Sequence, residues 1–228
     1  MASNITLGTL KTKCREQANM EFSSFVSDSE LVSYINDSLK SLYDMLIQSG
    51  EFYYVQSYDF QTVVNQDEYA LPSTLYKVLG VDYRLGTGEA RSMQRANWQD
   101  RNRYNNFPFF NTTQYAFYKY MLNGNNIRLM PTPSTGETIR LWYAPVLTDL
   151  VSDSDVIDVI NGFDDYVIAD VCIKMLAKEE SDIQPFLIMK QDAERRVQKM
   201  KRDRIQGDTA TIADVSSGQV INYYGIEF

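Results

Sequence analysis

Residues 27–50 read SDSELVSYINDSLKSLYDMLIQSG and carry the clearest helical pattern of the chain. Ser27 and Glu30 form a capping-box pattern, which marks the start of a helix. Leucine and isoleucine then recur every three or four residues, at positions 31, 35, 39, 42 and 46, and Ser49-Gly50 supplies a stop signal. The spacing predicts one long amphipathic helix from Asp28 to Gln48.

Helical spacing recurs near both ends of the chain. Leu7, Leu10 and Cys14 predict a shorter helix before the long one. An apolar face that starts at Phe163 predicts a third helix over 164–180. The buried stripe of a fourth helix is expected at five apolar positions: Phe186, Met189, Ala193, Val197 and Met200.

The middle of the chain has the pattern of strands. Aromatic and β-branched residues form short runs between turn residues, as is typical of β-structure. The runs expected to be extended are 52–55, 58–64, 69–72, 76–83, 114–121, 126–130 and 138–143. A short helix is expected between Met93 and Tyr104. The stretch 105–113 is expected to be an exposed loop whose apolar tip is either tucked in or a contact point.

These patterns predict an α+β fold. A helical bundle, made of an N-terminal helix pair and a C-terminal helix pair, carries an inserted antiparallel β meander and an extended C-terminal tail. We expect residues 1–50 and 146–207 to form one helical core, residues 51–145 to form the inserted β-rich domain, and residues 208–228 to form the tail. The chain has 228 residues, of which 44% are apolar, and this is enough to bury such a core.

Composition excludes several classes of function. Lysine and arginine number 22 against 30 aspartates and glutamates, and the net charge of −8 argues against a protein that grips nucleic-acid phosphates. The chain has no histidine, which excludes imidazole catalysis and histidine-ligated metal sites. Cys14 and Cys172 have no C-x-x-C partner and are expected on buried helix faces. Since there is no signal peptide or long apolar run, we expect a soluble protein that is not exported.

No catalytic, cofactor or metal residue is predicted. The sequence from Gly86 departs from G-x-G-x-x-G at its last position, and no G-x-S-x-G elbow occurs. Five acidic residues are numerous enough for a metal cluster but are better explained by a helix start and a solvated face: Asp164, Asp165, Asp170, Glu179 and Glu180. The alternative is a hydrolytic module with two carboxylates, or a carbohydrate-binding β module that uses Trp98 and Trp142 as a sugar platform.

The C-terminal quarter offers two candidate contact surfaces. Basic residues of the last helix either stay solvated at the negative helix end or meet an acidic partner, for which 149–165 of a neighbouring copy is a candidate. The residues expected at this inter-subunit contact are Asp153, Asp155, Arg195, Arg196 and Lys199. The tail is either frayed, or it docks by adding Val220–Tyr224 as a strand to a partner's sheet edge.

Several motifs resemble those of the head–tail adaptor proteins of tailed bacteriophages, also called connector or neck proteins. They are S-D-x-E-L-x-x-Y-I-N-x-S at 27–38, Y-x-L-P at 69–72, I-R-L-x-P-T-P at 127–133, L-x-Y at 141–143 and the helix pair within 163–201. The resemblance covers most of the chain. It implies a structural virion protein without cofactor or enzymatic activity, assembled in the host bacterial cytoplasm and located at the head–tail junction.

The resemblance also implies partners. Copies would form a dodecameric ring beneath the portal, through which genomic DNA passes without sequence-specific binding, and no membrane is involved. The residues that would contact the portal protein are Val220, Ile221, Tyr223, Tyr224, Ile226 and Phe228. Those that would face the next tail or nozzle protein are Phe107, Phe109 and Phe110. Another neck or tail-completion protein is the alternative within this class.

Overall fold

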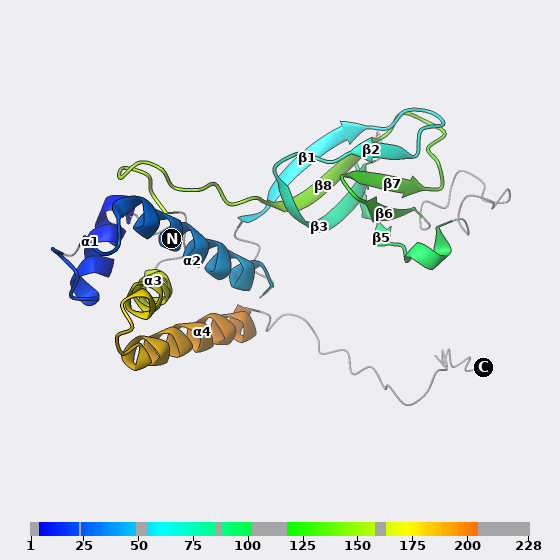
Figure 1. Cartoon of the computed structure of the whole chain (residues 1–228). Coiled ribbons are helices and arrows are strands. Elements are labelled where there is room, and N and C mark those ends of the chain that lie inside the picture. Colours follow the sequence, from blue (N-terminus) through cyan, green and yellow to red (C-terminus); the bar gives the residue numbers. More distant parts are fainter. Residues whose placement is uncertain are drawn as a thin grey trace, which may run out of the picture.

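A computed structural model of the chain describes residues 5–22, 24–48, 54–84, 88–101, 118–157 and 163–204. These residues form four α-helices and two four-stranded sheets, an α+β fold as predicted. Figure 1 shows the helices gathered on one side and the strands on the other. The segment that follows β8 returns from the strands along the helices.

The helices are α1 (Leu7–Gln17), α2 (Asp28–Gln48), α3 (Asp164–Lys178) and α4 (Gln184–Arg204). The prediction of one long helix from Asp28 to Gln48 is confirmed. Ser27 caps its start, because the Ser27 Oγ accepts a hydrogen bond from the Glu30 N–H at 3.3 Å. The Glu30 carboxylate turns to Lys178 of α3, at 2.7 Å, so the start of α2 is also tied to the end of α3.

One hydrophobic cluster gathers side chains from all four helices. The contribution of α2 consists of the positions predicted from their spacing, Leu31, Ile35, Leu39, Leu42 and Leu46. Cys14 of α1 and Cys172 of α3 are buried in the same cluster, where the Cys172 thiol faces the Cys14 carbonyl oxygen at 3.6 Å. Both cysteines pack as small apolar side chains on helix faces, as expected.

Among the side chains that the structure describes, which exclude that of Met200, the buried face of α4 departs from the prediction at one position. Ala193 and Val197 are buried, as expected, but Met189 is 42% exposed. The reason is that Lys190 lies on the buried face and reaches Asp170 of α3 at 2.7 Å. With Lys190 turned inward, Met189 lies at the edge of the contact with α3.

The strands form two sheets (Figure 1). One has the order β1-β8-β3-β4, with strands Gln56–Gln61, Thr138–Pro145, Leu75–Arg84 and Ala90–Ser92. The other has the order β2-β7-β6-β5, with strands Glu68–Ala70, Asn126–Met130, Lys119–Asn123 and Gln94–Arg95. Neighbouring strands are antiparallel except β5 and β6, which are parallel. Inward-facing residues of both sheets form a second hydrophobic cluster.

The strand order and several element boundaries differ from the expectation; for example, β1 ends at Gln61, whereas the expected run extends to Val64. The order is not that of a simple meander, because β8 enters between β1 and β3. Tyr54 and Val55 lie outside the strands. The helix expected after Met93 is reduced, within the described residues, to the 3-10 turn Trp98–Asp100. Residues 94–95 pair with β6 instead, and this pairing excludes them from a helix.

A buried carboxylate links three of the helices. Asp170 of α3 is only 6% exposed. Its oxygens accept hydrogen bonds from Ser38 of α2 at 2.6 Å and Lys190 of α4 at 2.7 Å, and they pair with Lys174 of α3 at 2.9 Å. Burial alone would raise the pKa of Asp170, but these three contacts outweigh it, so the pKa lies below the ordinary carboxyl value. An ionised Asp170 thus holds α2 and α4 against α3.

Replacing Asp170 with alanine is expected to lower the free energy of unfolding by about 3 kcal/mol, because three donors lose a common buried acceptor. The pKa of Asp170 is lower in the folded than in the unfolded state. The variant therefore loses the whole stabilisation at pH values above the unfolded-state pKa of about 3.9, and it loses less as the pH falls through the folded-state pKa. Urea unfolding near neutral pH and in acid measures both effects. Asp192→Ala, which removes an exposed pair with Arg195, is the control and should cost little. An equal loss at both pH values would contradict the role of an ionised carboxylate.

The turn between α3 and α4 holds a glutamate in an unusual backbone conformation. Glu180 has a φ of 60°, in the left-handed region that glycine favours. The Ser181 N–H donates to the Leu176 carbonyl at 3.0 Å, and the Glu180 N–H donates to the Ala177 carbonyl at 3.3 Å. These are the two hydrogen bonds of a Schellman helix end, in which glycine is the usual residue at the position of Glu180.

Glu180→Gly is expected to raise the free energy of unfolding by about 0.5–1 kcal/mol, because it removes the left-handed penalty of a residue with a side chain. Glu179→Gly is the matched control, since Glu179 has a φ of −84° and has no such penalty to lose. Urea midpoints of both variants provide the comparison. If Glu180→Gly is destabilised as much as Glu179→Gly, the strain assigned to Glu180 is absent.

Candidate assembly surfaces

The segment 146–157 is fastened along α2. Asn36 holds Leu150 with two hydrogen bonds, from its Nδ2 to the Leu150 carbonyl at 3.0 Å and from the Leu150 N–H to its Oδ1 at 2.9 Å. Lys40 pairs with Asp149 at 2.7 Å, and the Tyr43 hydroxyl donates to the carbonyl at the end of β8. The three α2 residues lie on one helix face, so α2 fixes the course of the segment.

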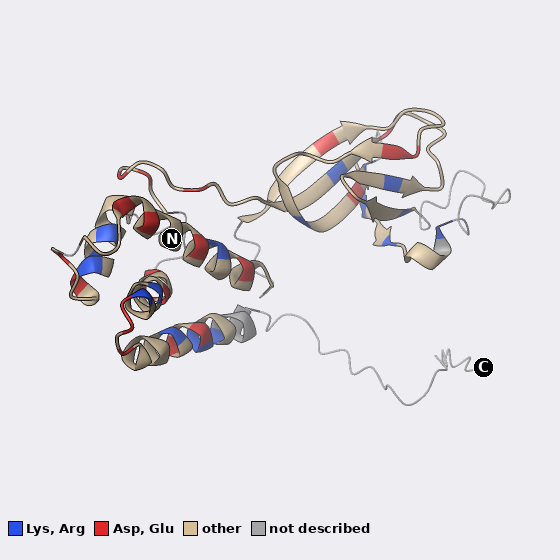
Figure 2. Ribbon diagram, viewed as in Figure 1, with Lys and Arg blue, Asp and Glu red and all other residues tan. Residues whose placement is uncertain are grey.

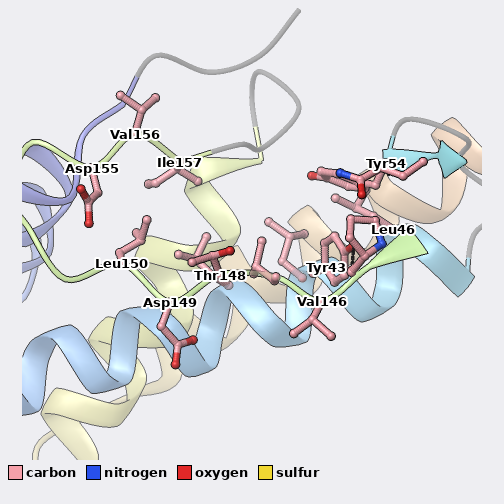
Figure 3. Close-up of a pocket in the computed structure, with 15 residues that line it drawn as sticks. Tyr43, Leu46, Tyr54, Val146, Thr148, Asp149, Leu150, Asp155, Val156 and Ile157 are labelled. Carbon is pink, nitrogen blue, oxygen red and sulfur yellow. Dashed lines mark hydrogen bonds between the residues drawn. The ribbon is translucent and has the colours of Figure 1, made fainter. Parts of the chain in front are cut away.

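A groove of about 510 Å³ lies between α2 and this segment. Figure 3 shows Tyr43 and Leu46 of α2 near Tyr54, and residues of the 146–157 segment along the other wall. Among the described residues that line the groove, Asp149 and Asp155 carry charge. The Asp149 carboxylate is paired with Lys40, and Asp155 is bonded to backbone groups. The described lining therefore offers no free acid–base pair for catalysis.

The acidic residues predicted at a subunit contact lie on this segment and have partners within the chain. Asp153 pairs with Lys11 of α1 at 3.0 Å, and this hydrogen bond raises the pKa of Lys11. The Asp155 carboxylate accepts the backbone N–H groups of Val151 and Ser152, each at 2.8 Å, and these bonds lower its pKa. Asp155 therefore stabilises its own loop, whereas Asp153 joins the loop to α1.

The basic residues predicted at the same contact lie on α4 and are exposed. Arg195 pairs with Asp192 of the same helix at 3.0 Å, and Arg196 pairs with Asp165 of α3 at 3.3 Å. Lys199 is exposed. Figure 1 shows α4 along one side of the helical group and the 146–157 segment along the other, so the chain does not bring the two predicted sets together. Figure 2 shows the acidic and basic positions on these two elements.

Exposed apolar side chains accompany both charged surfaces and were not singled out from the sequence. Val151 of the segment is 82% exposed, and Ile188 of α4 is 60% exposed. The exposure of Ile188 could have been predicted from helical spacing, because Ile188 lies seven residues before Arg195 and therefore on the same outer face of α4. Val151 lies in a connecting segment, where no periodicity distinguishes an exposed valine from a buried one.

The remaining predicted contact residues lie outside the described residues. They are Phe107, Phe109 and Phe110, and Val220, Ile221, Tyr223, Tyr224, Ile226 and Phe228.

Trp142 of β8 is poorly placed to serve as a sugar platform. Its Nε1 donates to Asp82 at 2.6 Å, and the Arg140 guanidinium lies 5.5 Å from the ring centre. The ring also lies against Gly80, since a Cβ at that position would be 3.9 Å from it. A flat, free ring face is what stacking on a ligand requires. Trp98 is exposed but is accompanied by Arg101, whose guanidinium lies 5.2 Å from its ring centre.

Three of the five acidic residues considered for a metal site have separate cationic partners. Asp164 pairs with Lys13, Asp165 pairs with Arg196, and Asp170 belongs to the buried network. Over the ranges that the structure describes, no group of three or more acidic or cysteine side chains is placed to hold a metal ion. None of the helices in these ranges is long and apolar enough to cross a membrane.

Comparison with known protein families identifies the family of the chain. The chain matches the family described as SU10 adaptor protein over residues 5–219. The match spans all four helices, both sheets and most of the residues that follow α4. A search of curated proteins finds no match. The chain therefore belongs to the SU10 adaptor protein family, in agreement with the resemblance of its motifs to phage head–tail adaptors.

Proposed function

We propose that this protein forms a ring, of dodecameric symmetry, beneath the portal and joins the DNA-filled head of the phage to its tail. The observation that carries the proposal is the family match over residues 5–219. An adaptor family is one of structural phage proteins. We further propose the division into a helical unit, residues 1–50 and 146–207, an inserted β-rich unit, residues 51–145, and a tail, residues 208–228.

The two charged surfaces support a ring. The face of α4 with Ile188 and Arg195 and the segment with Val151 and Asp153 differ in chemistry and lie on opposite sides of the helical group. A contact between two different faces is heterologous, and its repetition closes into a ring when the rotation fits. The partners that these charges have within the chain do not prevent this, because exposed ion pairs contribute little and exchange partners at low cost.

The charge of the chain suits a DNA passage. A net charge of −8 repels phosphates, so DNA would slide through the ring instead of binding to it. Residues 208–228 would contact the portal through their apolar positions, and the tip at 107–110 would face the next tail or nozzle protein.

Reversing charge on α4 is expected to prevent ring formation. Arg195→Glu combined with Lys199→Glu would turn attraction toward the neighbouring segment into repulsion and should lower the copy number per portal at least about tenfold. Quantitative mass spectrometry of purified particles, against portal and capsid proteins, measures this number. The matched rescue adds Asp153→Lys, which should restore the ring. A copy number that stays at one per portal subunit in the charge-reversed protein would contradict the α4 contact.

Deleting residues 208–228 is expected to abolish assembly onto portals while the helical and β-rich parts stay folded, because all the described helices and strands lie before residue 208. Circular dichroism tests the fold, and electron microscopy of portals mixed with the truncated protein tests the binding. Portals that are decorated normally by the truncated protein would show that the tail is not the portal contact.

A further inference from the structure

Strand β1 is an edge strand of unusual length for this fold. It pairs with β8 on one side, in a regular register over six residues. Among the described strands no partner lies on its other side. The other three edge strands are β4, β2 and β5, and they have only three, three and two residues. Proteins commonly shorten their edge strands because an open edge is a template for pairing with another segment.

The main-chain groups at this open edge can be assigned. The Thr62 N–H donates to the Glu137 carbonyl at 2.8 Å, directly beyond the last pair of β1 and β8. Hydrogen-bonded pairs alternate along an antiparallel ladder, so the even-numbered residues of β1 bond to β8. The N–H and C=O groups of Ser57, Asp59 and Gln61 therefore point away from the sheet.

The features that usually protect an edge are missing from β1. The strand contains no proline and no lysine, and its register has no bulge. Its single charge, Asp59, is neutralised by Arg140, whose guanidinium donates two hydrogen bonds of 2.6 Å to the carboxylate. Six main-chain groups of this edge therefore have no partner strand among the described residues, and the one charge beside them is neutralised.

An aromatic row leads from the second hydrophobic cluster to the open edge. The rings of Tyr69 and Phe60 are 5.1 Å apart, and those of Phe60 and Tyr58 are 6.1 Å apart. Tyr58, at the end of this row, is 41% exposed. A further strand with apolar side chains at alternate positions would cover Tyr58 and extend the row.

The chain itself contains a segment of matching chemistry. Residues 220–224 read VINYY, and 215–226 contain no charged residue and no proline. Such uncharged β-branched and aromatic segments are strong strand formers. Fifteen residues separate Arg204 from Val220, and an extended chain of this length spans about 50 Å. Figure 1 shows that α4 ends on the side of the helical group that faces the strands.

We propose that, before assembly, Val220–Tyr224 pairs with the open edge of β1 in the same chain. Ile221 and Tyr223 would face the side of Tyr58 and Phe60, and the alternate residues would face the polar side of the sheet. The pairing would cover the open edge of β1 and give a strand-forming segment a partner. Its regulatory consequence, release of the tail when a portal is present, rests on the proposed function, whereas the strand pairing itself does not.

Hydrogen exchange on the full chain tests the pairing directly. The amides of Ser57, Asp59 and Gln61 should be protected, although no described strand pairs with that edge. Asn222→Pro removes a donor from the added strand and should speed exchange of these amides at least about tenfold, whereas amides of even-numbered β1 residues stay protected by β8. Asn222→Thr, which keeps strand propensity, is the matched control and should leave the protection unchanged.

Two outcomes would overturn the proposal. Equal and fast exchange of the three amides in the parent and in Asn222→Pro would mean that the edge is open. Protection that rises with protein concentration would mean that the added strand comes from another molecule and not from the same chain. Portal decoration by the same variants is scored separately, so loss of the β1 pairing with normal ring formation would leave the proposed adaptor function intact.

Discussion

The helical part of this protein depends on one buried carboxylate. Asp170 accepts donors from α2, α3 and α4, and a buried charge is tolerated only when its partners satisfy it. The network around Asp170 therefore fixes the positions of the helices as well as stabilising them. Lys190 must lie opposite Asp170, and this requirement fixes the rotation of α4 about its own axis. It also explains why Ile188 and Arg195 lie on the surface and Met189 lies at its margin.

The long helix α2 relates the two candidate assembly surfaces to each other. Ser38 points inward to Asp170, and thereby connects α2 to the network that orients α4. Asn36, Lys40 and Tyr43 lie on another face and hold the 146–157 segment. Both surfaces are thus positioned by residues within two turns of one helix. Such a rigid relation between two different faces is what a closed ring requires, since the angle between them sets the number of copies.

The sequence was informative where a signal is local. Helical spacing predicted α2 to the residue, because five apolar positions and both end signals agree over 28–48. The strand order β1-β8-β3 could not be predicted from local patterns, because residues such as Asp59 and Arg140 become neighbours only through long-range strand pairing. The same limit applies to the contact surfaces. Charge indicated Asp153 as a contact residue, but nothing near it in the sequence reveals that Lys11 is its partner.

The internal pairing of these charges has a consequence for assembly. Because Asp153 and Arg195 already have partners, two free copies gain little by exchanging them, and exposed ion pairs are weak in any case. The charges alone would therefore add little to the association of copies in solution. On a common binding platform, neighbouring copies are held at a high effective concentration, and many weak contacts then act together. In the proposed ring, charges that already have partners within each chain would favour closure on the portal over closure in solution.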